Sequence, residues 1–340
     1  MSARLSRREL LHGAAWAALG VAVGHSDAHA SAIRAIRIAS AAGDLELTMN
    51  ALMSQLGFMQ ALGLEPELLS VTDGTRILGA VVSGSVDISA LAGFGQVFPA
   101  IEHGAALKIL AGGALRPSLA LFSAKPRIKT LAALSGKIVG TGSIGALIYQ
   151  LTVTLLRKYG VSTAGIRFVN IGSSVDVFHA VRIGIVDAGA ADAALIGEAS
   201  RYGVHALEHG NISLELPEYT FQGIWTSDQK ISSKRDALVR ALAAYGKLFR
   251  FVESAAAKEA FQRARRSVYP NVSAADQQAH WNYVQTYKPY AVNLTLTPER
   301  LTYMQQLNVQ FGIQSKLLPF EQVADMSLAR DAVELLQANG

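Results

Sequence analysis

The chain has 340 residues, of which 50% are hydrophobic, and its formal net charge is +5. It contains no cysteine, which excludes disulfides, thiol catalysis, thiolate metal sites and a lipoprotein anchor. The mild positive charge suits anionic ligands, but no run of Lys and Arg is interleaved with aromatic residues, so we expect no nucleic-acid partner.

Residues 1–30 have the pattern of a cleaved export signal. A positive segment with three arginines precedes a mostly apolar run over residues 10–23, and Ala28–Ala30 has the small-x-small form that a signal peptidase cleaves. The sequence around Arg7 and Arg8 resembles a twin-arginine signal, with ordinary secretion as the alternative. The apolar run is shorter than the roughly 20 residues that span a bilayer, which disfavours a retained anchor. We therefore expect a periplasmic protein whose mature chain is not inserted in the membrane.

Strand-like and helix-like segments alternate from residue 33 to about residue 219. In chain order, the expected strands are residues 35–39, 66–71, 86–91, 137–139, 166–171 and 220–226, and the expected helices between them are 47–62, 75–82 and 145–159. After residue 233 the pattern is almost wholly helical. The alternation predicts an α/β fold with mixed or parallel sheets flanked by helices, and we expect the helical C-terminal tail to pack around them.

An eight-residue segment occurs twice, 100 residues apart. Residues 80–87 and 180–187 share five of their eight residues, and each copy has the pattern of a helix end, a glycine turn and a buried strand. We interpret the aspartate of each copy, Asp87 or Asp187, as a structural group whose carboxylate accepts amides near the turn. The repeat favours two lobes of like construction, with chance similarity between two common units as the alternative.

Short motifs in a fixed order carry a resemblance to a known family. They are Gly57-Phe58, Gly63-Leu64-Glu65, Gly84–Ile88, His103-Gly104, Leu107–Leu110, Leu131–Lys137, Thr141-Gly142-Ser143 and Gly184–Ala188. With these motifs the chain resembles the periplasmic substrate-binding proteins of nitrate, sulfonate, taurine and thiamine-precursor ABC importers, over nearly the whole mature sequence. The loop at Ser40–Leu45 lacks the proline that the family often has there, so the choice of ligand stays open.

The resemblance implies a type II periplasmic-binding-protein fold, in which two crossing strands join two α/β lobes and a ligand cleft lies between the lobes. By that mapping, residues 33–122 and 225–340 form lobe one and residues 123–224 form lobe two, with crossings near Leu121–Pro126 and Phe221–Trp225. The resemblance also implies closure by a hinge motion, and an ABC permease and its ATPase as partners. We expect a monomer.

The glycine-rich turn over residues 140–145 contains four candidate ligand contacts, Thr141, Gly142, Ser143 and Ile144. The turn formally matches a dinucleotide fingerprint, but no acidic residue ends the next strand, which argues against a dinucleotide. Free amides at a helix start, with two hydroxyl groups, instead favour an anion or a strongly polar group. A self-contained glycine turn without a ligand is the alternative.

Further candidate contacts follow strands of each lobe. Gly93, Phe94 and Gly95 follow the strand that contains Asp87. Ser40 ends the first expected strand, and Asp192 follows the strand of the second copy of the repeat. Glycines let backbone amides approach a ligand closely. The Phe94 ring could stack on a ligand, with packing in the core as the alternative.

No catalytic or metal-binding constellation stands out. His205 and His209 have helical spacing but no third ligand nearby, and we expect no cofactor. The sequence therefore predicts a non-enzymatic receptor that captures a small organic anion, a sulfonate or a carboxylate, with a nitrogen heterocycle left open. An enzyme on the same fold, similar to the pyrimidine synthases or aromatic desulfinases, is disfavoured because those families use an active-site cysteine. A ligand-sensing subunit of a signalling system would use the same cleft and stays open.

Overall fold

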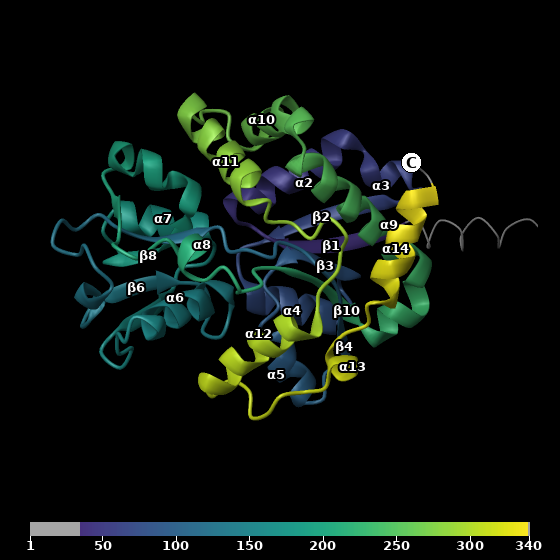
Figure 1. The fold of residues 1–340 in the computed structure, drawn as a ribbon, viewed down its shortest axis with the longest axis horizontal. Coiled ribbons are helices and arrows are strands. Elements are labelled where there is room, and N and C mark those ends of the chain that lie inside the picture. The colour runs from purple at the N-terminus through teal and green to yellow at the C-terminus, as the bar shows by residue number, and fades with distance from the viewer. Residues whose placement is uncertain (1–34, 339–340) are drawn as a thin grey trace, which may run out of the picture.

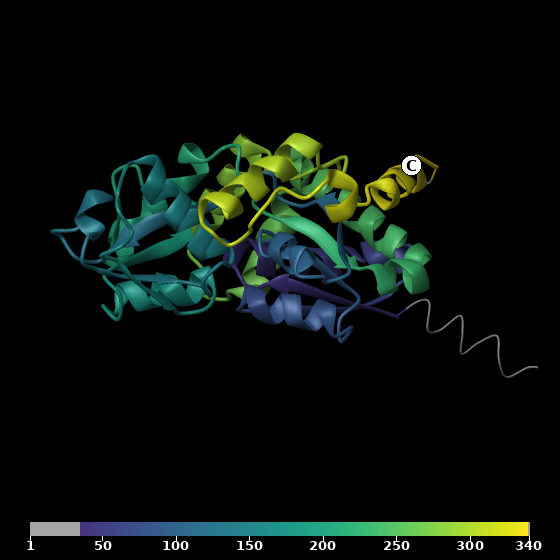
Figure 2. The ribbon, with the colours of Figure 1, turned by 90° about the horizontal axis from the view of Figure 1, so that it is seen from below.

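In the computed structural model, which describes residues 35–338, the chain forms two five-stranded sheets with helices on their faces (Figure 1). Seen from below, the molecule is elongated, with one lobe around each sheet (Figure 2). The predicted α/β fold class is therefore confirmed, while the expected export signal lies outside the described residues.

The first sheet has the strand order β2-β1-β3-β10-β4. Its strands are β1 (Ala35–Ala41), β2 (Glu65–Val71), β3 (Ile88–Ala92), β4 (Leu107–Gly112) and β10 (Gly223–Ser227). β1 pairs in parallel with β2 and β3, whereas β10 runs antiparallel to both β3 and β4. The strand that is last in the sequence thus has an interior place in this sheet.

The second sheet has the strand order β7-β6-β8-β5-β9. Its strands are β5 (Leu119–Ser123), β6 (Ile138–Thr141), β7 (Arg167–Asn170), β8 (Ala188–Asp192) and β9 (His205–Ala206). β6 pairs in parallel with β7 and β8, and β5 runs antiparallel to β8. Both sheets therefore contain three parallel strands with the earliest one in the middle, followed by an antiparallel strand.

Helices cover both sheets. Between the strands lie α2 (Asp44–Leu56), α3 (Phe58–Ala61), α4 (Gly74–Val82), α5 (Val97–Glu102), η1 (Ala132–Leu134), α6 (Leu147–Lys158), α7 (Ser174–Arg182), η2 (Ala193–Tyr202) and α8 (Ile212–Glu215). The C-terminal tail contains α9 (Asp228–Glu253), η3 (Ala255–Ala257), α10 (Lys258–Val268), α11 (Ala274–Tyr287), α12 (Pro298–Gln310), α13 (Phe320–Val323) and α14 (Ser327–Ala338). Within the described part of the chain, no helix is both long and apolar enough to cross a bilayer.

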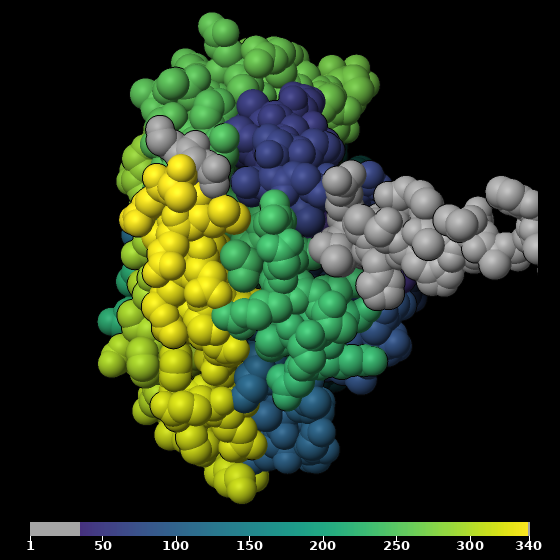
Figure 3. All heavy atoms as spheres, turned by 90° about the vertical axis from the view of Figure 1, so that its right-hand side faces the viewer, coloured from purple at the N-terminus to yellow at the C-terminus, as the bar shows by residue number. Residues whose placement is uncertain are grey.

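The tail packs around both lobes instead of forming a separate unit. α14 lies along α9 at the far end of the first lobe, where Figure 3 shows them side by side in yellow and green. α10 packs against α2 of the first lobe, and α11 packs against η2 of the second lobe. α11 therefore connects the two lobes on one side of the molecule (Figure 1).

The repeated segment has the same place in both lobes, at the end of α4 before β3 and at the end of α7 before β8. The glycine of each copy has a positive φ, 73° and 77°, which a residue with a side chain rarely adopts. Asp87 accepts a hydrogen bond from the amide of Arg37 in β1 at 2.9 Å, and Asp187 accepts one from the amide of Ile138 in β6 at 2.7 Å. Each aspartate thus ties its turn to the central parallel strand, which explains why both copies keep it.

The chain crosses between the sheets over residues 113–118 and 207–222. The first crossing lies earlier than the expected Leu121–Pro126, because β5 pairs with β8 from Leu119 onward. The second ends where β10 begins, close to the expected position. The limits of the two lobes as continuous domains stay a prediction.

Candidate ligand-binding site

A cavity of about 70 Å³ lies between the two lobes. Its wall on the first lobe comes from the loop after β1, the loop after β2 and the loop after β3. Its wall on the second lobe comes from the loops after β6, β7 and β8. The carboxyl ends of the parallel strands of both sheets therefore meet here, which is where α/β sheets generally bind ligands.

Four of the predicted contacts line this cavity: Gly93, Gly95, Gly142 and Asp192. A Cβ atom on Gly93 would lie 2.6 Å from Cβ of Leu147, and one on Gly95 would lie 2.1 Å from Oε1 of Gln150. Both neighbours belong to α6 of the other lobe. Gly93 and Gly95 thus allow the lobes to approach each other, and ligand contact by either glycine stays a prediction.

The other five predicted contacts, Ser40, Phe94, Thr141, Ser143 and Ile144, are not among the lining residues. Ser40 is buried and accepts a hydrogen bond from Nδ2 of Asn50 at 2.6 Å. The Phe94 ring is buried and packs edge-on against Phe98, with 5.7 Å between the ring centroids. These two side chains belong to the interior of the first lobe.

The three non-glycine residues of the predicted glycine-rich turn also have other environments. The Thr141 hydroxyl is buried and donates to the carbonyl oxygen of Gly142 at 2.9 Å. Ser143 donates a hydrogen bond to Asp73 of the first lobe and accepts one from Asn170 at 2.9 Å. Ile144 is 76% exposed. Ser143 therefore takes part in a contact between the lobes at the rim of the cavity.

Two carboxyl groups face the cavity, Asp192 from the second lobe and Glu46 from the first. Glu46 lies in the first turn of α2 and accepts a hydrogen bond from Gln222 through Oε1. Its other oxygen folds back over Gly43, where an added Cβ atom would lie only 2.1 Å away. Burial raises the pKa of Glu46 to about 7, and the charge of Asp192 adds to that rise.

Sequence reasoning missed Glu46. An acidic residue in the first turn of a helix is common, because it offsets the positive end of the helix dipole. What makes Glu46 unusual is burial beside a carboxylate from the other lobe, and this depends on the tertiary structure.

None of the described residues that line the cavity is Lys, Arg or His. The polar side chains in the wall are those of Glu46, Thr72, Gln96, Ser118, Ser173, Ser174 and Asp192. The remaining wall is formed by glycines, alanines and the apolar side chains of Val71, Ile77, Leu119, Leu147, Ile148 and Phe221. The cavity thus combines negative and neutral polar groups with an apolar surface.

Among the described residues, five α-helices begin at the cavity, α2, α4, α5, α6 and α7, and the chain itself supplies carboxylates to the N-termini of three of them. Asp73 caps α4 and accepts the amides of Thr75 and Arg76 at 2.8 and 3.2 Å. Ser173 and Asp176 form a reciprocal capping box at α7, and Glu46 accepts its own amide in the first turn of α2. α5 and α6 begin without a side-chain cap. Acidic side chains of the protein therefore already pair with amides at three of these five helix starts.

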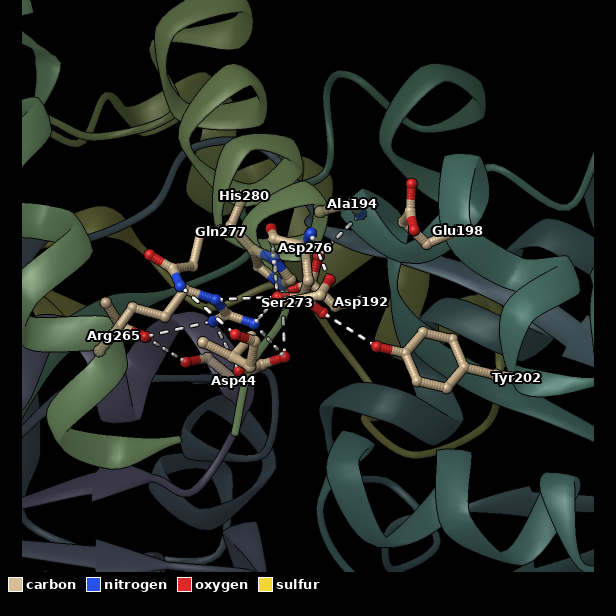
Figure 4. Close-up of polar contacts among 12 residues, drawn as sticks. Asp44, Asp192, Ala194, Glu198, Tyr202, Arg265, Ser273, Asp276, Gln277 and His280 are labelled. Atoms are coloured by element: carbon tan, nitrogen blue, oxygen red, sulfur yellow. Dashed lines mark hydrogen bonds and ion pairs between the residues drawn. The ribbon is translucent and has the colours of Figure 1, made fainter. Parts of the chain in front are cut away.

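A buried ion-pair network lies behind Asp192 (Figure 4). His280 of α11 places Nε2 3.6 Å from Oδ2 of Asp192 and 3.3 Å from Oδ2 of Asp44, and its Nδ1 lies 3.2 Å from Asp276. Arg265 of α10 pairs with Asp44 at 2.8 Å and with Asp276 at 2.5 Å. The network joins α2 of the first lobe, the end of β8 in the second lobe and two helices of the tail.

The charge state of this network follows from its geometry. Burial opposes a charge on His280, but the charges of Asp192 and Asp44 outweigh it and raise the His280 pKa well above its ordinary value. Burial likewise opposes a charge on Asp44, but the charges and hydrogen bonds of His280 and Arg265 outweigh it and lower the pKa of the Asp44 carboxyl. His280 is therefore a buried cation that links carboxylates of both lobes.

The side chains of Asp44, Asp192 and His280 bring one donor atom each to within 4.8 Å of one another, a spacing that a metal ion could use. Arg265, however, donates to both oxygens of Asp44, at 2.8 and 3.2 Å. A guanidinium in contact with a carboxylate repels a second cation there. The arrangement is that of an ion-pair network.

Comparisons with known proteins agree with this geometry. A family model described as "ABC transporter, phosphonate, periplasmic substrate-binding protein" matches residues 40–277. No curated protein matched the sequence.

Several solved structures have a similar fold. The alkanesulfonate-binding protein SsuA of Xanthomonas axonopodis pv. citri, bound to MOPS, aligns with a TM-score of 0.67 at 16% identity, over 88% of this chain and 97% of that chain. The aliphatic sulphonate-binding SsuA of Escherichia coli gives 0.62 at 18% identity, over 86% and 92%. The nitrate-binding NrtA of Synechocystis PCC 6803 gives 0.71 at 12% identity, over 90% and 89%. At these identities the similarity concerns the fold.

Proposed function

Because the chain belongs to the periplasmic substrate-binding proteins of ABC transporters, we propose that it captures a small solute between its lobes and delivers it to an ABC permease and its ATPase. The observation that carries the proposal is the cavity between the lobes, whose walls come from the carboxyl ends of strands in both sheets. A solute held there contacts both lobes at once, so it stabilises the closed arrangement over the open one.

Contacts across the rim support closure as the working motion. Asp73 of the first lobe accepts hydrogen bonds from Ser143 and from Asn170, the latter at 3.2 Å. On another side, Gln150 of α6 donates to Oδ1 of Asn308 in α12 at 2.8 Å. These polar contacts can break and re-form as the lobes separate and meet.

The kind of solute is the finer question. The mild net charge and the uncapped start of α6 favour the anion expected from the sequence. Glu46 and Asp192 oppose it, because they bring negative charge into a buried cavity whose described wall has no Lys, Arg or His. An anion there would face carboxylates from both lobes without a matching cation.

The function needs no chemical step, and the same cavity would serve a sensing subunit. An enzyme remains the competing class, since a buried carboxyl such as Glu46, with its raised pKa, is a group that enzymes use to move protons. Recovery of the ligand separates these classes, because a receptor returns it unchanged.

The test is a thermal-unfolding screen of the chain from Ser31 onward against amines, amidines, sulfonates, carboxylates, nitrate and nitrogen heterocycles. A ligand at about 1,000 times its dissociation constant adds roughly 4 kcal/mol to the free energy of unfolding. We expect one chemical class to raise the melting temperature and to be recovered unchanged. A binder recovered in altered form would favour the enzyme. Absence of any binder, together with no solute released from the purified protein, would contradict the proposal.

A further inference from the structure

We infer that the cavity binds a small organic monocation, a protonated amine or amidine, whose nitrogen lies between the carboxyl groups of Glu46 and Asp192. The inference rests on the proposed function and names the chemical class of its solute. The two carboxyls belong to opposite lobes and both line the cavity. Each is more than nine-tenths buried, with exposed fractions of 7% and 4%.

The first step of the argument is the charge of the buried groups. Behind the cavity, the carboxylates of Asp44, Asp192 and Asp276 face the cations Arg265 and His280. Even when Glu46 is protonated, one negative charge in this set has no partner. A single positive charge in the cavity balances it, whereas an anion would increase the imbalance in a poorly hydrated place.

The second step concerns hydrogen-bonding groups that have no partner. Ser118 and Ser174 line the cavity and are 4% and 7% exposed. Among the described residues, neither hydroxyl makes a hydrogen bond within the protein, so both are free to bind a group in the cavity that they line. Ser174 lies near Glu46, since both side chains approach the position that a Cβ atom on Gly43 would take. A nitrogen with several N–H groups can donate to a carboxylate and a hydroxyl oxygen at once.

The third step is the state of the helix ends. Anions bind helix N-termini through free amides, but α2, α4 and α7 present amides that Glu46, Asp73 and Asp176 already occupy. At these three helices an anionic ligand would have to displace side chains of the protein, whereas α6 begins without a side-chain cap. A cation would leave these pairings intact and would use Glu46, the one of the three carboxyl groups that lines the cavity, together with Asp192.

The size and lining of the cavity limit the rest of the ligand. About 70 Å³ is room for roughly five water molecules, so only a few heavy atoms beyond the charged group fit. Ile77, Leu147 and Phe221 are among the apolar side chains that would cover a short hydrocarbon part. The positive charge of the ligand also explains closure. Glu46 and Asp192 approach each other when the lobes close, and a cation between them removes the repulsion between the two carboxylates.

The experiment compares probes of similar size and different charge by calorimetric titration and thermal unfolding of the purified protein. The cations are propylammonium and acetamidinium, the anions are propanesulfonate and butyrate, and propanol is the neutral probe. The variants are Glu46→Gln and Asp192→Asn. The matched control is Glu67→Gln, which makes the same charge change at an exposed position of β2.

We expect the cations alone to raise the melting temperature of the unmodified protein. Glu46→Gln and Asp192→Asn should each weaken cation binding about tenfold or more, since a charge-assisted hydrogen bond is lost, while Glu67→Gln leaves binding unchanged. Melting of each variant without a probe reports whether it has folded. If Glu46→Gln fails to fold, the effect of Asp192→Asn on cation binding decides the test.

Other outcomes overturn the inference. Binding of propanesulfonate or butyrate without cation binding would contradict it while leaving the receptor function intact. Equal binding of propanol and propylammonium would show that charge has no part in recognition. A response to zinc chloride alone, with none to the organic cations, would assign the carboxyl groups to a metal. No effect of either cation at millimolar concentration would also contradict it.

Discussion

Glu46 and Asp192 face one cavity from opposite lobes, and the charge of Asp192 adds to the rise in the Glu46 pKa. One carboxyl starts a helix of the first lobe and the other ends a strand of the second. Their proximity therefore exists only when the lobes are together. We therefore expect ligand capture, protonation of Glu46 and lobe closure to be coupled through this pair.

The raised pKa of Glu46 makes stability depend on pH. The folded protein holds the proton up to about pH 7, whereas the unfolded chain releases it near 4.5. The contribution of the protonated group is fully present below pH 4.5 and is lost as the pH rises through 7. In Glu46→Gln this loss disappears, so the variant should gain stability over the unmodified protein between pH 5 and pH 8, by on the order of 2–3 kcal/mol. Urea unfolding of both proteins at the two pH values measures the difference, and Glu67→Gln should show none.

His280 is predicted to hold the lobes and the tail together through its charge. His280→Gln leaves Asp44, Asp192 and Asp276 with a single cation, so we expect a loss of about 3–5 kcal/mol. The pKa of His280 is raised in the folded state, so its contribution is fully present below about pH 6.5 and declines as the pH rises through the raised value. Unfolding at pH 6 and pH 9 should therefore show the larger deficit at pH 6. The exposed His103 provides the control, and an equal loss in His103→Gln would contradict the argument.

Gly93 and Gly95 are predicted to be required for closure. An alanine at Gly95 would place Cβ 2.1 Å from Oε1 of Gln150, and one at Gly93 would place it 2.6 Å from Cβ of Leu147. We expect Gly95→Ala or Gly93→Ala to keep the lobes apart and to weaken ligand binding about tenfold, because the closed state becomes rare. Small-angle scattering with saturating ligand checks this, since the variants should not contract. Gly79→Ala is the control, because nothing lies within 4 Å of its added Cβ, and contraction of all three variants would refute the prediction.

The rim contact between Asp73, Ser143 and Asn170 is predicted to slow ligand release. Ser143→Ala and Asn170→Ala each remove a hydrogen bond to Asp73 across the cleft. A hydrogen bond to a charged group at a mostly exposed position is worth about 1 kcal/mol, so each change should speed dissociation roughly fivefold with little effect on association. Stopped-flow displacement measures both rates. Ser83→Ala removes an exposed hydroxyl elsewhere on the first lobe and should leave them unchanged.

The sequence predicted the fold well because the evidence was local and repeated. In each copy of the repeat, residues 80–87 and 180–187, the glycine and the aspartate act within one turn and on one neighbouring strand. Their pattern can therefore be recognised in the sequence without knowing how the rest of the chain folds. The resemblance to periplasmic substrate-binding proteins, carried by such motifs, is confirmed by the family match and the similar solved structures.

The site was harder to predict because it depends on how side chains fold back and on what the other lobe presents. The sequence expected Asp192 and three glycines at the ligand site from their position after strands, and these residues line the cavity. It expected Phe94 there for the same reason, but the Phe94 ring packs against Phe98 in the interior of the first lobe. The expected anion followed from the turn that opens α6, and that helix does begin at the cavity without a side-chain cap. The acidic side chains that pair with amides at α2, α4 and α7 beside it are revealed only by the three-dimensional contacts.

The place of β10 has a consequence for the order in which the protein folds. All strands of the second sheet lie within residues 119–206, whereas the first sheet needs residues 223–227 between β3 and β4. During synthesis the N-terminal half of the first lobe therefore waits, with two unpaired strand edges, while the second lobe is made and can fold. The lobe that begins the described chain is therefore the last to be completed, and until β10 is made the facing edges of β3 and β4 have no partner strand.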